Sequence, residues 1–192
     1  NAKINHLFNA EEDLVMARLH VGLKQWWIQG LEKEDHLASD ENKSAVEKFK
    51  TKLRWKDNEK WFDCGGVGVL FYAVGSNETN VVRELLRELK RSFNGVEYAR
   101  HLESRVRNEG YVTLGIPGGV TTLMISMMLA TPTVVSMLLE FGANVQSVDA
   151  MGNDALMLAS IFGRPKNLQC WLQRVKDWDL NRQNTVVGGC AL

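Results

Sequence analysis

The chain has 192 residues, of which 45% are hydrophobic and 24% are charged, and its formal net charge is zero. This composition is ordinary for a globular protein, and the zero net charge argues against a general electrostatic partner such as nucleic acid. No apolar run approaches the roughly 18 residues that span a bilayer. The three cysteines, Cys64, Cys170 and Cys190, have no paired spacing, so neither a disulfide framework nor a zinc site is expected. A reducing intracellular compartment is expected, the cytoplasm first and an organelle as the alternative.

Residues 1–61 are expected to form an N-terminal helical cap region with a charged linker. Residues 9–31 are expected to form a helix with a broad apolar face that includes Trp26 and Trp27. Both tryptophans are interpreted as packing residues, with a partner-facing aromatic patch as the alternative. Residues 32–60 carry many charges of both signs, which indicates a solvated linker followed by an exposed helix at about 44–55.

The second part of the chain repeats itself. The motif that contains Gly119 returns around Gly152, at an offset of 33 (152 − 119), and in both places a proline, Pro132 or Pro165, precedes an apolar helical pattern. Self-similarity at such a period indicates stacked supersecondary units, none of which can bury its apolar face alone. Each unit is expected to contain a short apolar helix, a second helix and an extended turn of hairpin type.

An earlier copy of the unit is separated from these two by an insertion. The stretch 63–86 aligns with the copy that contains Gly119 at an offset of 53. This offset equals one period of 33 plus an insertion of 20. The insertion is placed at about 93–111 and is expected to contain an extra helix, 95–107. Its apolar side would consist of Val96, Ala99, Leu102 and Val106. An insertion between repeats lies on a surface loop, often on the binding side.

The repeating unit resembles the ankyrin repeat. The sequence DAMGNDALMLAS from Asp149 matches D-x-x-G-x-T-P-L-H-x-A-A, and LEFGANV from Leu139 matches L-x-x-G-A-D-V. The T-P-L-H tetrapeptide reads TTLM at Thr121 and DALM at Asp154, so both units lack its histidine. The resemblance implies an all-α fold class, an ankyrin-type helical solenoid with short β-hairpin turns, extended here by N-terminal helices and a helical insertion.

The same resemblance sets the expected domain boundaries. An ankyrin-repeat domain would cover residues 62–192, with repeats at about 63–92, 116–148 and 149–181 and a truncated repeat at 184–192. Because the last five residues resemble the opening of a further repeat, the sequence is expected to be a fragment of a longer protein.

No pattern in the sequence predicts catalysis or a bound metal. The glycine-rich stretch 65–68 lacks the lysine of a phosphate-binding loop, so a repeat turn is the preferred interpretation and nucleotide binding the alternative. The four histidines have no metal or triad spacing and are interpreted as surface or cap residues: His6, His20, His36 and His101. A protein without enzymatic activity, cofactor or metal is expected.

The region between residues 83 and 107 is locally basic. Glutamates alternate with its arginines and lysines, which predicts helix ion pairs instead of a uniform basic stripe. An acidic protein partner is a weaker hypothesis for this region, and a nucleic acid a weaker one still.

In ankyrin-like stacks the hairpin tip and the end of the first helix line the concave side. Carried over position by position, the expected partner-binding residues are Val120, Met128, Leu129, Val148, Met151, Asn153, Ile161 and Phe162. Exposed apolar residues in such positions favour a protein partner, and packing under the insertion or a neighbouring repeat is the alternative. The expected function is protein–protein interaction or scaffolding, with a structural accessory subunit of a larger multiprotein assembly as the alternative.

Overall fold

The described residues of this computed structural model are 43–53, 67–106 and 116–191. All their regular elements are helices, and no β-strand occurs among them, which confirms the predicted all-α class. The expected helix around Trp26 and Trp27 and the motif at 63–66 lie outside the described residues. The helices are α2 (Ala45–Lys52), α3 (Val69–Gly75), α4 (Thr79–Ser92), α5 (Gly95–Leu102), α6 (Thr122–Leu129), α7 (Pro132–Glu140), α8 (Ala155–Ile161) and α9 (Pro165–Arg174).

Local sequence signals account for the helix starts. Pro132 and Pro165 occupy the first turns of α7 and α9, where the missing N–H of proline needs no partner. The Thr121 hydroxyl accepts the backbone N–H of Met124 at the start of α6. The Asp154 carboxylate accepts the N–H of Met157 in the same way at the start of α8.

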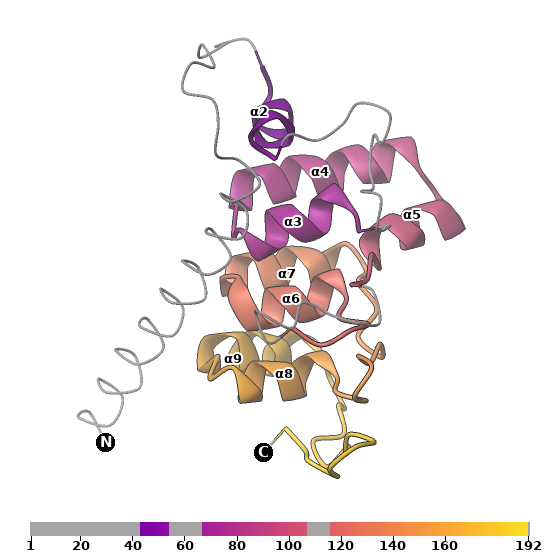
Figure 1. Cartoon of the computed structure of the whole chain (residues 1–192), viewed down its shortest axis with the longest axis vertical. Helices are drawn as coiled ribbons and strands as arrows, with labels where there is room; N and C mark the ends of the chain where they lie inside the picture. The colour runs from indigo at the N-terminus through magenta and orange to yellow at the C-terminus, as the bar shows by residue number, and fades with distance from the viewer. Residues whose placement is uncertain (1–42, 54–66, 107–115, 192) are drawn as a thin grey trace, which may run out of the picture.

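The helices form a stack of antiparallel pairs in two layers (Figure 1). In one layer α6 lies between α3 and α8, and in the other α7 lies between α4 and α9. The second helices of the three predicted units are therefore neighbours, as the sequence indicates. Helix α2 lies against α4 on the side away from α7, and its Phe49 is buried there.

Helix α6 forms the centre of the core. All eight of its residues are buried, because α3, α7 and α8 surround it. Its polar side chains bond to backbone carbonyls, the Ser126 hydroxyl to Leu123 O at 2.6 Å and the Thr122 hydroxyl to Ser104 O at 3.4 Å. The helix therefore has no face that requires water.

Two polar side chains of the next pair cover the C-terminal end of α6. The amide nitrogen of Asn167 lies 3.0 Å from both Met127 O and Ala130 O and 3.3 Å from Ser126 O. The Arg164 guanidinium also donates to Ala130 O, at 3.0 Å. Carbonyls at a helix end have no partner within the helix, so this contact satisfies buried groups that packing alone would leave unpaired.

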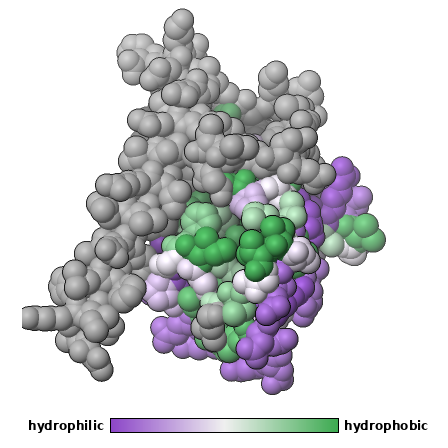
Figure 2. Space-filling view, turned by 60° about the horizontal axis from the view of Figure 1, so that its bottom comes forward, coloured by the Kyte–Doolittle hydropathy of each residue, from purple (hydrophilic) through white to green (hydrophobic). Residues whose placement is uncertain are grey.

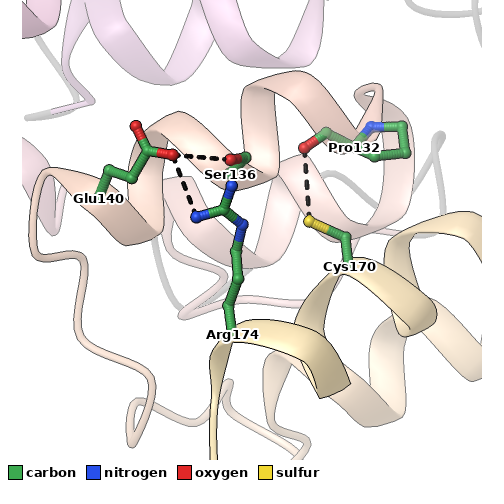
Figure 3. Close-up of polar contacts among 5 residues, drawn as sticks. All are labelled: Pro132, Ser136, Glu140, Cys170 and Arg174. Carbon is green, nitrogen blue, oxygen red and sulfur yellow. Dashed lines mark hydrogen bonds and ion pairs between the residues drawn. The ribbon is translucent and has the colours of Figure 1, made fainter.

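Helices α7 and α9 are also joined at their outer surface (Figure 3). Arg174 forms an ion pair with Glu140 at 3.0 Å, and the Ser136 hydroxyl donates to the same carboxylate oxygen. The Cys170 thiol lies 3.6 Å from the carbonyl of Pro132. Both residues of the ion pair are well exposed, so the pair adds little to stability.

The prediction for the insertion is partly wrong. Helix α5 ends at Leu102 instead of continuing to residue 107, and its Val96 is 84% exposed. Leu102 is buried as expected, but Ala99 faces solvent. Val106 lies outside the helix, where its backbone exchanges hydrogen bonds with Gly119 N and Val120 O, both at 3.0 Å. This backbone pairing requires an extended chain after residue 103, which ends the helix early.

The predicted β-hairpin turns are not confirmed, because the described turns contain no strands. An isolated antiparallel bridge joins Arg105, after α5, to Thr121, before α6. The turn before α8 is closed by a bond from Asp149 N to Asn153 O at 2.9 Å, and it contains Gly152 at φ 79°. Left-handed backbone of this kind favours glycine.

Replacement of Asn167 tests whether its amide stabilises the end of α6. We expect Asn167→Leu to lower the free energy of unfolding by about 1–3 kcal/mol, because buried carbonyls lose their donors. Urea denaturation followed by circular dichroism measures this change. Gln169→Leu on the exposed side of the same helix is the matched control, with an expected change within about 0.5 kcal/mol. Equal stability of the two variants would show that the amide does not cap α6.

Candidate protein-interaction surface

Half of the predicted partner-binding residues are not accessible. Val120, Met128, Leu129 and Asn153 are each at most 2% exposed, so their predicted exposure is wrong. Met128 and Leu129 belong to α6, which other helices surround. The side chain of Asn153 lies within a turn, where it donates to the carboxylate of Asp149 at 2.9 Å.

The other four predicted residues reach the surface. Ile161, at the end of α8, is 65% exposed, and Met151, in the turn before α8, is 40% exposed. Val148 and Phe162 are half-buried. These residues belong to the turn before α8 and to the C-terminal end of that helix.

Three further exposed apolar side chains belong to the same end of the stack. They are Leu172 on α9 and Val186 and Val187 in the segment after it. Viewed toward this end, apolar side chains gather at the centre of the face, with hydrophilic residues beside them (Figure 2). We call these exposed residues the terminal apolar surface: Met151, Ile161, Leu172, Val186 and Val187.

Comparison of equivalent positions explains why this surface is uncovered. Ile161 is the equivalent, one period later, of Met128, which is completely buried. Met128 lies in a helix between two neighbours of its layer, whereas α8 contacts only α6 within that layer among the described helices. Leu172 is related in the same way to the half-buried Leu139. Ile161 and Leu172 are therefore apolar residues at positions that the preceding unit covers wholly or in part.

A series of hydrogen bonds fixes the turns beside this surface. Ala150 N donates to Gly118 O at 2.8 Å, which joins two successive turns. On the other side, the Thr185 hydroxyl donates to Met151 O at 3.2 Å. A side chain at Gly152 would meet Thr185, because an added Cβ would lie 2.5 Å from its hydroxyl oxygen. Met151 is thus held on a backbone of defined geometry.

The insertion is attached to the loop between α7 and α8. The Glu103 carboxylate accepts the backbone N–H of Asn144 at 2.7 Å and the hydroxyl of Ser147 at 3.4 Å. The Arg105 guanidinium donates to the same hydroxyl at 3.0 Å and to Val148 O at 3.3 Å. Burial raises the pKa of Glu103 above its ordinary value of 4.5, although these hydrogen bonds and the charge of Arg105 act in the opposite direction.

Residues with catalytic chemistry do not converge on this surface in the described part of the chain. His101 is buried, its ring lies 4.3 Å from that of Phe93, and burial lowers its pKa. The other three histidines and Cys64 lie outside the described residues. Within the described ranges, no cluster of three or more His, Cys, Asp or Glu residues could hold a metal ion. None of the described helices is long and apolar enough to cross a membrane.

Comparison with models of known protein families and with curated proteins found no match. The interpretation of this surface therefore depends on its own geometry and residues.

The raised pKa of Glu103 predicts a particular pH dependence of stability. Because the folded protein holds the proton of Glu103 more tightly than the unfolded chain, the Glu103 contribution to stability decreases as the pH rises through the range above 4.5. The quantity to follow is the free energy of unfolding of the wild type minus that of Glu103→Gln. We expect this difference to increase as the pH falls from about 7 toward 4.5.

The lowered pKa of His101 has the opposite effect, because it makes folding less favourable as the pH falls. His101 is present in both the wild type and Glu103→Gln, so its effect cancels in the difference between them. Urea denaturation at a series of pH values measures the difference. A difference that is constant with pH, or that moves in the opposite direction, would contradict the assignment.

Proposed function

We propose that this protein is a non-catalytic protein–protein interaction module that binds a partner protein through the terminal apolar surface. The observation that carries the proposal is the 65% exposure of Ile161, whose equivalent one period earlier is fully buried. An exposed group of apolar side chains beside polar residues is typical of an interaction site.

We further propose that the helix pairs form an ankyrin-type solenoid. The constant repeat period, the stacked antiparallel pairs and the prolines at the starts of α7 and α9 support this assignment. Glycines with positive φ at equivalent turn positions, Gly119 at 77° and Gly152 at 79°, support it as well. In such stacks the turns form part of the binding side, and Met151 belongs to the turn before α8.

A structural subunit of a permanent assembly is the second candidate function. Permanent interfaces are larger and more apolar than transient ones. The exposed Leu172, Val186 and Val187 extend the apolar area beyond the turn and the end of α8, which favours this candidate. Size-exclusion chromatography with light scattering separates the two, because a stable monomer contradicts a role that requires permanent association.

A pull-down with matched variants tests the proposed surface. We expect Ile161→Asp combined with Leu172→Asp to abolish the capture of a partner that the wild type retains, because a buried unpaired carboxylate opposes binding. Quantitative mass spectrometry of proteins cross-linked to each bait measures the loss.

The matched control is Val96→Asp, which places the same charge on the most exposed valine of the insertion. We expect this variant to retain the partner. If no captured protein is lost with the double variant, or if the control loses the same proteins, the terminal apolar surface is not the binding site.

A further inference from the structure

The basic residues of α4 form a row along one side of the helix. Arg83, Arg87 and Arg91 follow one another at intervals of four residues, and Lys90 is the i+3 neighbour of Arg87. Arg87, Lys90 and Arg91 are exposed, and Arg83 is half-buried. We call these four residues the basic row.

The acidic residues of α4 form a second row beside the first. Glu84 and Glu88 are also four residues apart, and each lies three residues before an arginine of the basic row, Arg87 or Arg91. The predicted ion pairs between the rows do not form among the described residues. Arg83 instead donates to the side-chain oxygen of Asn80, at 3.0 Å. The two rows of α4 therefore lie side by side, and the described residues form no ion pair between them.

One residue of the basic row, Lys90, lies near the end of α7. The ammonium group of Lys90 is 5.5 Å from the ring centre of Phe141, at the end of α7. Helix α2 lies on the opposite side of α4 (Figure 1). The carboxylate of α7 at this end, Glu140, is already engaged by Arg174 and Ser136 (Figure 3). The described part of the protein therefore leaves the basic row without a carboxylate partner.

We propose that the basic row is the docking site for an acidic segment of a partner protein. Guanidinium groups bind carboxylates through paired hydrogen bonds, and exposed arginines retain that capacity. From Arg83 to Arg91 the row extends over about 12 Å, at a rise of 1.5 Å per residue, which matches a short peptide segment. Helices α6 and α7 lie between α4 and the last pair, α8 and α9, so the site is separate from the terminal apolar surface.

The acidic row favours a peptide over a nucleic acid. A polyanion broad enough to cover α4 would also approach Glu84 and Glu88, whose charges repel it. Four basic residues release few counterions, and the chain has no net positive charge to add to them. A narrow acidic segment contacts the basic row and can avoid the acidic one.

A labelled peptide of ten glutamates tests the proposal by fluorescence anisotropy at low salt. We expect it to bind the full chain, and a peptide of ten glutamines not to bind. Arg87→Gln combined with Arg91→Gln should weaken the binding roughly tenfold, as expected for the loss of two charge contacts. Glu84→Gln combined with Glu88→Gln should strengthen it, because this change removes the repulsive row.

Lys166→Gln combined with Lys176→Gln is the matched control, because it removes the same charge from exposed residues at the other end of the stack. We expect it to change the affinity less than twofold, by the distance dependence of screened charges. The proposal is overturned if the glutamate peptide does not bind, or if both pairs of basic substitutions weaken binding equally. Tighter binding of a ten-nucleotide thymidine strand than of the peptide would also overturn it, in favour of nucleic acid.

Discussion

Helix α6 is apolar on every side, and the rest of the fold depends on how it is covered. A helix without a polar face is stable only when protein surrounds it, and α3, α7 and α8 do so here. The C-terminal carbonyls of α6 need donors as well, and Asn167 and Arg164 of the following pair supply them. The pair α8–α9 therefore completes the cover and the hydrogen bonds of α6, as expected for a stack whose units depend on their neighbours.

The same requirement explains where the protein exposes apolar residues. Helix α8 resembles α6 in composition, and its residues from Ala155 to Ala159 are buried. The segment after α9 contacts both helices of this pair: the Ser160 hydroxyl of α8 donates to Ala191 O, and Trp178 packs edge-on against the fully buried Trp171 of α9 at 5.3 Å. This segment contains no described helix, and Ile161 and Leu172 stay accessible. Ile161 and Leu172 thus stand at positions that the following helix pair helps to cover in the preceding unit.

Features that depend on local pattern could be predicted from the sequence, whereas exposure and capping could not. The repeat period, the proline starts of α7 and α9 and the order of the second helices follow from residue types at fixed spacing. Exposure depends on what covers a residue, so Met128 and Ile161 hold equivalent positions but have opposite accessibility. Asn167 is equivalent to Val134 of the preceding unit, so in the sequence it interrupts the apolar pattern of the second helix. The role of the Asn167 amide becomes clear only in the structure, where it donates to the carbonyls at the end of α6, which are far away in the sequence.

The two proposed surfaces differ in the physical basis of binding, and this difference makes them separable. The terminal apolar surface would bind by removing apolar area from water, a contribution that salt weakens little. The basic row on α4 would bind through exposed charges, which salt at physiological strength screens over about 8 Å. Helices α6 and α7 separate α4 from α8 and α9 in the stack (Figure 1). Substitutions on the two surfaces have no shared contacts, so their effects on the binding of a partner that spans both should add.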